Sequence, residues 1–115
     1  MVVINDAPPT VEISADPARL AAGGRVSVSL EAHDDDLLAG WALVITTADG
    51  ALVQRLAGGP LATADFLTAR DWNTDDRLKA PVPPGRYRIE ASVIDRGRNA
   101  AQAIADVEIC DGPCP

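Results

Sequence analysis

Apolar and polar residues alternate along most of this chain, and the alternation predicts β-strands. In residues 26–32, Val26, Val28 and Leu30 alternate with serine and glutamate, and the same period recurs over 87–93. A period of two is typical of a strand with one buried face. Weaker alternation predicts further strands, seven in all: 11–15, 26–32, 38–47, 51–56, 66–70, 87–93 and 101–109.

Turn-forming residues separate the predicted strands. Asp49-Gly50 predicts a tight hairpin turn between 38–47 and 51–56, because glycine accepts a positive φ without steric cost. We expect His33–Asp36 to be a polar break, Gly58–Pro60 to end the hairpin, and Ala18–Ala22 to form one helical turn. Seven short strands joined by such turns indicate an all-β fold, a seven-stranded antiparallel Greek-key sandwich.

Length and charge limit the organisation and the partners. With 115 residues the chain has room for one domain, which we place at 10–109. We interpret residues 1–9 as a linker or pairing segment: Pro8-Pro9 favours extended backbone, and the apolar Val2-Val3-Ile4 before it could pair with a neighbouring strand. Residues 110–115 form a cysteine-containing tail. A net charge of −7 argues against nucleic acid and anionic membrane surfaces as partners, and no apolar run is long enough to insert in a membrane.

The two cysteines, Cys110 and Cys114, lie close together in that tail. Gly112-Pro113 between them can turn the chain, so a local disulfide is sterically feasible. A bridge to a neighbouring segment and two free thiols remain open alternatives. A disulfide would indicate an oxidising compartment, which predicts an extracellular, cell-surface or periplasmic location.

The second half of the chain resembles bacterial immunoglobulin-like domains. The resemblance rests on Asp71-Trp72-Asn73, on Val82–Ile89 and on Ala91–Asp95, and in pattern it is similar to the Ig-like domain of the flagellar hook-capping protein. The first half, with Ala7–Ile13 and Ala32–Asp36, is more distantly similar to PKD and cadherin-like repeats. The resemblance implies an Ig-like sandwich in an exported bacterial protein.

Two aromatic residues are expected in the core of such a sandwich. Trp41 lies on the third predicted strand, where sandwiches commonly bury a tryptophan. Tyr87 follows Pro83-Pro84-Gly85, and a tyrosine at that corner can bury its ring while its hydroxyl bonds an upstream backbone group.

Few residues suggest chemistry. Calcium prefers oxygen ligands, and candidates occur in two predicted loops that meet at one end of an Ig-like sandwich: Asp34, Asp35, Asp36, Asp95 and Asn99. A solvated acidic loop is the simpler interpretation of the same residues. Trp72 could serve as an exposed glycan platform. We predict that the chain is not an enzyme. The lone histidine, His33, is not accompanied by a recognisable nucleophile motif, and the sequence contains no glycine-rich phosphate-binding loop.

The sequence therefore predicts a non-catalytic structural or interaction module of an exported bacterial protein, acting as a spacer, adhesion unit or assembly subunit. Its partner would be a protein, bound through an edge strand or loops, neighbouring copies included. The alternatives are a calcium-stiffened adhesion repeat and the carbohydrate-binding module of an extracellular enzyme. No other cofactor is expected.

Overall fold

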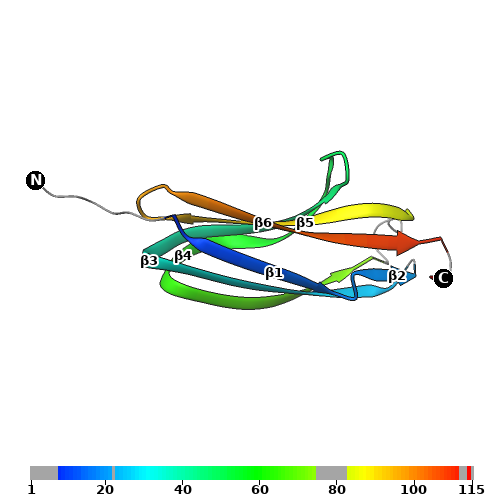
Figure 1. Ribbon diagram of the computed structural model, residues 1–115, viewed down its shortest axis with the longest axis horizontal. Coiled ribbons are helices and arrows are strands. Elements are labelled where there is room, and N and C mark those ends of the chain that lie inside the picture. Colours follow the sequence, from blue (N-terminus) through cyan, green and yellow to red (C-terminus); the bar gives the residue numbers. More distant parts are fainter. Residues whose placement is uncertain (1–7, 22, 75–82, 112–113, 115) are drawn as a thin grey trace, which may run out of the picture.

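A computed structural model describes residues 8–21, 23–74, 83–111 and 114, and in these residues the chain is all-β (Figure 1). No helix occurs among them, so none is available to cross a bilayer. The strands are β1 (Thr10–Asp16), β2 (Arg19–Ala21), β3 (Arg25–Thr47), β4 (Leu52–Asn73), β5 (Gly85–Asp95) and β6 (Ala100–Cys110).

Two long strands, β3 and β4, contribute to both layers of the sandwich. The first part of β3 pairs with β1 and with the end of β4, whereas its second part pairs with the start of β4 and with β5. Sheet order then continues from β5 to β6 and β2. Register shifts between His33, Leu38 and Gly40 mark the place where β3 changes layer, as strands do at the corners of sandwiches.

The all-β sandwich is confirmed, but the strand count differs from the predicted seven. Residues 26–32 and 38–47 belong to one strand, because the polar His33–Asp36 stays in extended backbone instead of forming a loop. Residues 51–56 and 66–70 are likewise joined in β4, which runs through Gly58–Pro60. Neither the polar residues at His33–Asp36 nor the turn-forming residues at Gly58–Pro60 therefore require a loop.

The predicted helical turn at Ala18–Ala22 is wrong. Arg19–Ala21 forms the short strand β2, which pairs in parallel with β6 and makes the sheet mixed instead of purely antiparallel. Leu20 is buried, and the Glu108 backbone N–H donates to the Ala18 carbonyl over 2.9 Å. Three residues carry too little periodicity to distinguish a helical turn from a strand.

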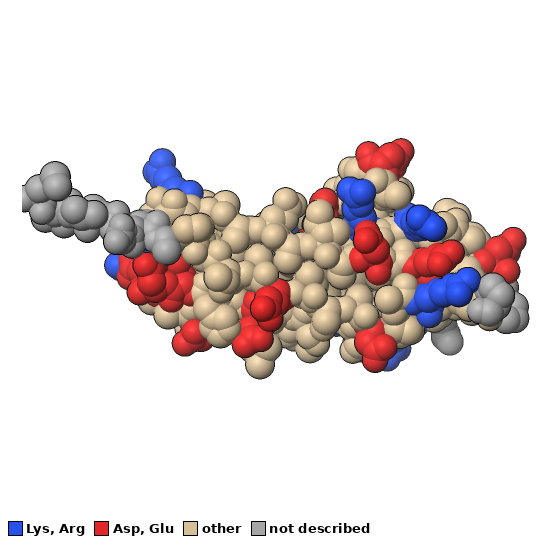
Figure 2. Space-filling view, viewed as in Figure 1, with Lys and Arg blue, Asp and Glu red and all other residues tan. Residues whose placement is uncertain are grey.

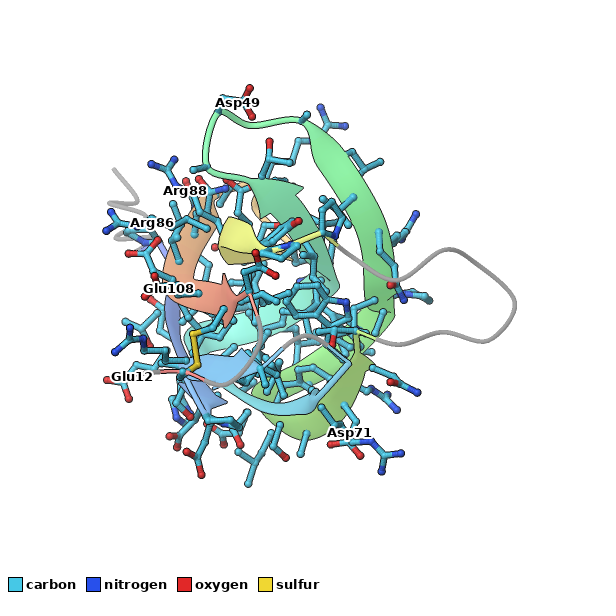
Figure 3. The ribbon with its side chains drawn as sticks, turned by 90° about the vertical axis from the view of Figure 1, so that its right-hand side faces the viewer. Glu12, Asp49, Asp71, Arg86, Arg88 and Glu108 are labelled. Atoms are coloured by element: carbon cyan, nitrogen blue, oxygen red, sulfur yellow. A yellow bond between two sulfur atoms is a disulfide. The ribbon has the colours of Figure 1, made fainter. Side chains whose placement is uncertain are left out.

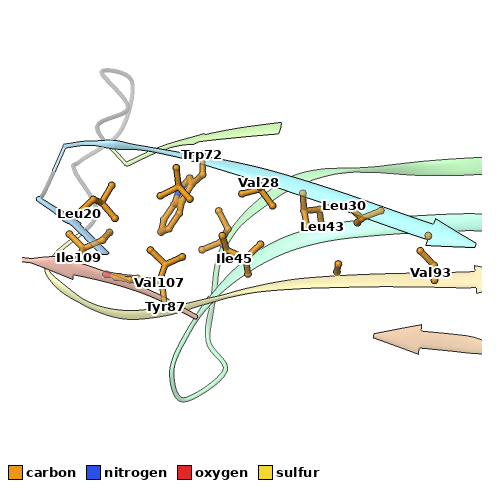
Figure 4. Packing of buried hydrophobic residues seen from close by; sticks show 14 of the residues in the cluster. Leu20, Val28, Leu30, Leu43, Ile45, Trp72, Tyr87, Val93, Val107 and Ile109 are labelled. Carbon is orange, nitrogen blue, oxygen red and sulfur yellow. The ribbon is translucent and has the colours of Figure 1, made fainter. Parts of the chain in front are cut away.

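The core is formed by the inward side of the alternating strands (Figure 4). Val26, Val28 and Leu30 of β3 face Ile89 and other β5 and β6 residues, and all are nearly fully buried. Burying one such side chain contributes on the order of 1.5–3 kcal/mol.

The central aromatic residue of this core is Trp72, not Trp41. Trp72 is 0% exposed and meets Tyr87 edge to face, with 5.7 Å between ring centroids. Trp41 is only partly buried and packs at the margin of the core. Tyr87 is 5% exposed, and its hydroxyl donates to the Pro83 carbonyl over 2.5 Å.

The described strands form an elongated, rod-like sandwich and run mostly along its long axis (Figure 1). We call one end the entry end: it carries the start of β1 at Thr10, which pairs with His33, and the turn between β5 and β6. The opposite, exit end carries the end of β6, where Cys110 pairs with Ala21 of β2. The chain therefore enters and leaves the fold at opposite ends of its long axis.

Candidate functional site

The residues predicted to bind calcium lie at the entry end, where Figure 2 shows acidic side chains gathered. Asp34, Asp35 and Asp36 lie at the bend of β3, and Asp95 and Asn99 close the turn between β5 and β6. Leu38 pairs with Asp95, and the Arg96 backbone N–H donates to the Leu37 carbonyl over 2.9 Å. The structure thus brings together two segments that are about sixty residues apart in sequence.

Most of these carboxylates already have protein partners. Asp95 is buried, and its two oxygens accept from the Asn99 backbone N–H over 2.7 Å and from the Asn99 Nδ2 over 3.2 Å. Asp36 accepts two hydrogen bonds, of 2.8 and 2.9 Å, from one terminal nitrogen of Arg96. Across the described ranges, no three histidine, cysteine or acidic side chains converge as a metal site requires. The calcium hypothesis stays a prediction.

Asp34 is the unusual member of this group. Its Oδ1 is buried without a hydrogen-bond partner, while Oδ2 accepts from the Asp36 backbone N–H over 3.3 Å. Burial raises the pKa of Asp34, and the charges of Asp95 and Asp35 raise it further. Because the folded pKa lies above the unfolded one, the ionised Asp34 carboxylate opposes folding at neutral pH.

We therefore expect Asp34→Asn to raise the melting temperature at neutral pH by a few degrees. Asparagine removes the charge but keeps an oxygen that can accept from the Asp36 backbone N–H. The gain should disappear below about pH 3.5, where aspartate is protonated in both states. Thermal unfolding followed by circular dichroism at both pH values measures this, with Asp16→Asn, at an exposed position at the end of β1 and away from this group, as the control. A lower melting temperature for Asp34→Asn at neutral pH would contradict the assignment.

His33 forms a second charged cluster, which sequence analysis missed. Its Nδ1 lies 2.6 Å from an Asp65 oxygen, and its Nε2 lies 3.0 Å from a Glu31 oxygen. The hydrogen bond to Asp65 raises the pKa of His33 most, followed by the one to Glu31. Glu31 could have been recognised, since residues two apart share one face of a strand. Asp65 could not, because its position depends on the pairing of β3 with β4.

This cluster predicts pH-dependent stability. With a folded pKa above 6.5, the stabilisation by protonated His33 is full below about pH 6.5 and is lost as the pH rises through the folded value. His33→Gln should therefore lower the melting temperature more at about pH 5.5 than at about pH 8.5. Denaturation curves at the two pH values test this. An equal loss of melting temperature at both pH values would show that the imidazolium contributes nothing to stability.

The aromatic residues do not form the predicted glycan platform. Trp72 is fully buried, so its ring has no exposed face. The partly exposed aromatic group is instead Trp41, which lies 4.9 Å from the Phe66 ring and 5.8 Å from the Arg70 guanidinium carbon. Arg70 over the indole is a cation–π contact that occupies that face of the ring.

At the exit end the structure contains a disulfide and a charged face. Cys110 and Cys114 form a disulfide with their Cα atoms 5.3 Å apart, which confirms the local pairing (Figure 3). Arg86, Arg88 and Glu108 lie on the same side of the sandwich in that view. Arg19 of β2 forms an ion pair with Glu108 over 3.3 Å. Residues 112–113 and 115 of the tail lie outside the described residues.

Comparison with known proteins supports the fold. No family model matches the chain, and no curated protein matches its sequence. Among solved structures, the chain is similar to a CARDB domain from Pyrococcus furiosus, determined in complex with di-metal ions, with a TM-score of 0.57 and 17% identity. The match covers 96% of this chain and 94% of that domain. At this identity the likeness shows the fold alone: the chain has an immunoglobulin-like β-sandwich fold.

Proposed function

We propose that this domain is a non-catalytic spacer and interaction module of an exported protein. The observation that carries the proposal is the elongated arrangement of the strands: β1 begins at one end of the long axis of the fold and β6 ends at the other (Figure 1). Domains of this shape can be joined in line, so each adds nearly its full length to a chain of domains. We also propose that the chain is related to the Ig-like domain of the flagellar hook-capping protein. The hydrogen bond from the Tyr87 hydroxyl to the Pro83 carbonyl, at the start of β5, supports this relationship.

The disulfide supports the proposed extracellular, cell-surface or periplasmic location. Disulfides persist in oxidising compartments and are rare where thiols are kept reduced. Cys110–Cys114 closes a small ring at the point where β6 ends.

Small-angle X-ray scattering of two copies joined through residues 110–115 and 1–9 tests the spacer proposal. A spacer predicts a maximum dimension close to twice that of the single domain, because entry and exit lie at opposite ends. The matched control joins the same two copies through a long Gly/Ser linker, which behaves as a flexible coil. A native-linker tandem that folds back into a compact pair would contradict the proposal.

The surface proposed for protein partners is the free edge of β4. This strand of 22 residues pairs only with β3 among the described strands. Two of its large apolar side chains are exposed, Leu52 at 69% and Leu67 at 75%. Long, apolar edge strands pair readily with strands of other chains, and neighbouring copies are the partner we propose.

Sedimentation of the full chain at increasing concentration tests this edge. We expect reversible self-association that Leu67→Lys removes, because a charged side chain on an edge strand opposes further pairing. Ile104→Lys, which adds the same charge at an exposed position away from β4, is the control and should associate normally. A chain that stays monomeric at high concentration would exclude neighbouring copies as the partner.

A second candidate function is binding of a divalent cation at Asp34. The specific observation in its favour is the buried, unpartnered Asp34 Oδ1 beside the charge of Asp95. A cation there would offset both the burial of the carboxylate charge, which raises the Asp34 pKa most, and the repulsion by Asp95 and Asp35. If calcium binds, it should raise the melting temperature of the parent chain, and a chelator should reverse the rise, but Asp34→Asn should not respond. A parent chain insensitive to both would exclude calcium.

A further inference from the structure

The two parts of β4 differ in how readily another strand can pair with them. Two register shifts interrupt the pairing of residues 52–60 with β3, and Gly58-Gly59-Pro60 lies in the same part. Bulges twist an edge and proline has no N–H to donate, so both oppose strand addition. Residues 65–73, in contrast, pair with residues 25–33 of β3 without a shift, at one margin of the sandwich (Figure 1). The regular part of the free edge is therefore 65–73.

One hydrogen bond identifies the backbone groups that this edge offers. The Thr74 N–H, just after β4, donates to the Gly24 carbonyl over 3.1 Å, so Thr74 and Gly24 form a hydrogen-bonded pair. Hydrogen-bonded and non-hydrogen-bonded pairs alternate along an antiparallel ladder. The β4 residues whose N–H and C=O groups point away from β3, toward the free edge, therefore include Asp65, Leu67, Ala69 and Asp71. The Ser27 hydroxyl donates to Asp71 over 3.3 Å, which agrees, because side chains lie closer in non-hydrogen-bonded pairs.

The side chains of these four residues are all exposed on the outer face of the layer. Leu67 is 75% exposed and lies between Asp65 and Ala69. Charged side chains protect edges from unwanted pairing, but here the carboxylates of Asp65 and Asp71 leave the middle of the edge apolar. Because like charges directly opposite each other destabilise a strand pair, the two aspartates restrict the register in which another strand can bind.

A second copy of the same edge fits in the antiparallel register that places the two Leu67 side chains opposite each other. Each Asp65 then lies opposite Ala69 of the other copy, and no two carboxylates meet. A shift that brings Leu67 opposite Ala69 also brings Asp65 opposite Asp71. A shift that brings Leu67 opposite either aspartate sets an apolar side chain against a charge. The Leu67–Leu67 register is therefore the favoured one.

The other edge of this layer, β1, is a poorer partner for β4. The exposed side chains of β1 include Glu12 and Asp16, so pairing it with β4 of another copy would gather these carboxylates beside Asp65 and Asp71. Pairing of two different edges also continues into an open filament, whereas pairing of β4 with itself closes as a two-fold dimer.

We propose that two copies of this domain pair antiparallel through residues 65–69 of β4, about a two-fold axis at Leu67. The inference rests on the self-association proposed above and specifies its segment and register. A contact of about five residues per copy belongs to the weak, reversible class of interfaces. Because Asp65 pairs with His33 at the entry end, the two rods would overlap near their entry ends, and their exit ends would point in opposite directions.

Cysteine cross-linking of the full chain tests the register. Under mild oxidation, at concentrations where the parent chain associates, Leu67→Cys should form a disulfide-linked dimer, because residues opposite each other in a hydrogen-bonded pair lie about 5.5 Å apart. Ala69→Cys should not, since the two copies of residue 69 lie about four residues apart along the strands, roughly 13 Å. Leu52→Cys, at an exposed position in the interrupted part of β4, is the control and should remain monomeric on a non-reducing gel.

Charge substitutions at Ala69 provide an independent measurement. Ala69→Asp places a second carboxylate opposite Asp65 of the other copy, whereas Ala69→Lys places an ammonium group there. Sedimentation should therefore show association that is roughly tenfold weaker for Ala69→Asp than for Ala69→Lys, since two such pairs form in each dimer. Ile104→Asp and Ile104→Lys make the same change in net charge at an exposed position away from β4 and should differ little.

The results separate this inference from the proposals on which it rests. If the parent chain associates but Leu67→Cys gives no dimer, or Ala69→Cys or Leu52→Cys cross-links as well as Leu67→Cys, the register is wrong while self-association stands. Equal association of Ala69→Asp and Ala69→Lys would also overturn it. A parent chain that stays monomeric removes both the register and neighbouring copies as the partner, but leaves the spacer proposal to the scattering of the tandem chain.

Discussion

Replacing Trp72 by alanine should cost about 3–5 kcal/mol of unfolding free energy, the largest single-residue effect we expect in this domain. The indole is 0% exposed and contacts the Tyr87 ring, so its removal leaves a cavity between the layers. Its Nε1 has no hydrogen-bond partner, so the loss is one of packing alone. Urea denaturation followed by circular dichroism measures the change.

Trp41→Ala is the matched control, because Trp41 is the other tryptophan and is only partly buried. Its loss should be clearly smaller, since part of the ring already contacts water. If Trp72→Ala does not fold, Trp72→Phe keeps a ring in the site and should remain measurable. A larger loss from Trp41→Ala than from Trp72→Ala would restore Trp41 as the core residue and contradict the fold described here.

Gly58→Ala should cost about 1–3 kcal/mol because the backbones of β3 and β4 approach too closely for a side chain at this position. A Cβ on Gly58 would lie 2.9 Å from the Trp41 carbonyl oxygen and 3.3 Å from the Ala42 Cα. These are backbone atoms, which cannot rotate away, whereas the Arg55 nitrogen at 2.9 Å can. Thermal and urea unfolding of the variant measure the cost.

The adjacent glycine provides the control. Gly59→Ala meets nothing within 4 Å, so it should be neutral or stabilise by about 0.4–1 kcal/mol through the less flexible unfolded chain. Opposite effects at neighbouring positions would locate the close approach at Gly58. Equal effects would mean that β4 does not run continuously through Gly58–Pro60.

The strand segments were predictable where burial alternates over several residues. Residues 26–32 and 87–93 lie in β3 and β5 with the expected side buried. The continuity of β3 through His33–Asp36 was not predictable, because it depends on pairing with distant residues, as between Leu38 and Asp95. The burial of Trp72 was not predictable for the same reason. Alternation shows which face of a strand a side chain occupies, but not how completely the opposite layer covers it.

The candidate sites were predictable only in part. The loop positions of an Ig-like sandwich brought the β3 bend and the turn after β5 to one end, as expected. Which carboxylates would acquire partners was not visible, since the ion pair of Asp36 with Arg96 spans sixty residues. The unpartnered Asp34 oxygen likewise follows from local packing, which a single sequence does not contain.

The pair-distance distribution of the single domain tests the central claim most directly, namely that this fold is a rod entered and left at opposite ends. In the structure β1 begins at one end of the long axis of the fold and β6 ends at the other, whereas a compact, nearly spherical domain of 115 residues would have a radius of gyration of about 13 Å and a symmetric distribution. We predict that small-angle X-ray scattering of the monomer gives an elongated, asymmetric distribution, and that a chain lacking residues 1–7 keeps it. A symmetric distribution for the chain lacking residues 1–7 would contradict the rod and the spacer function built on it.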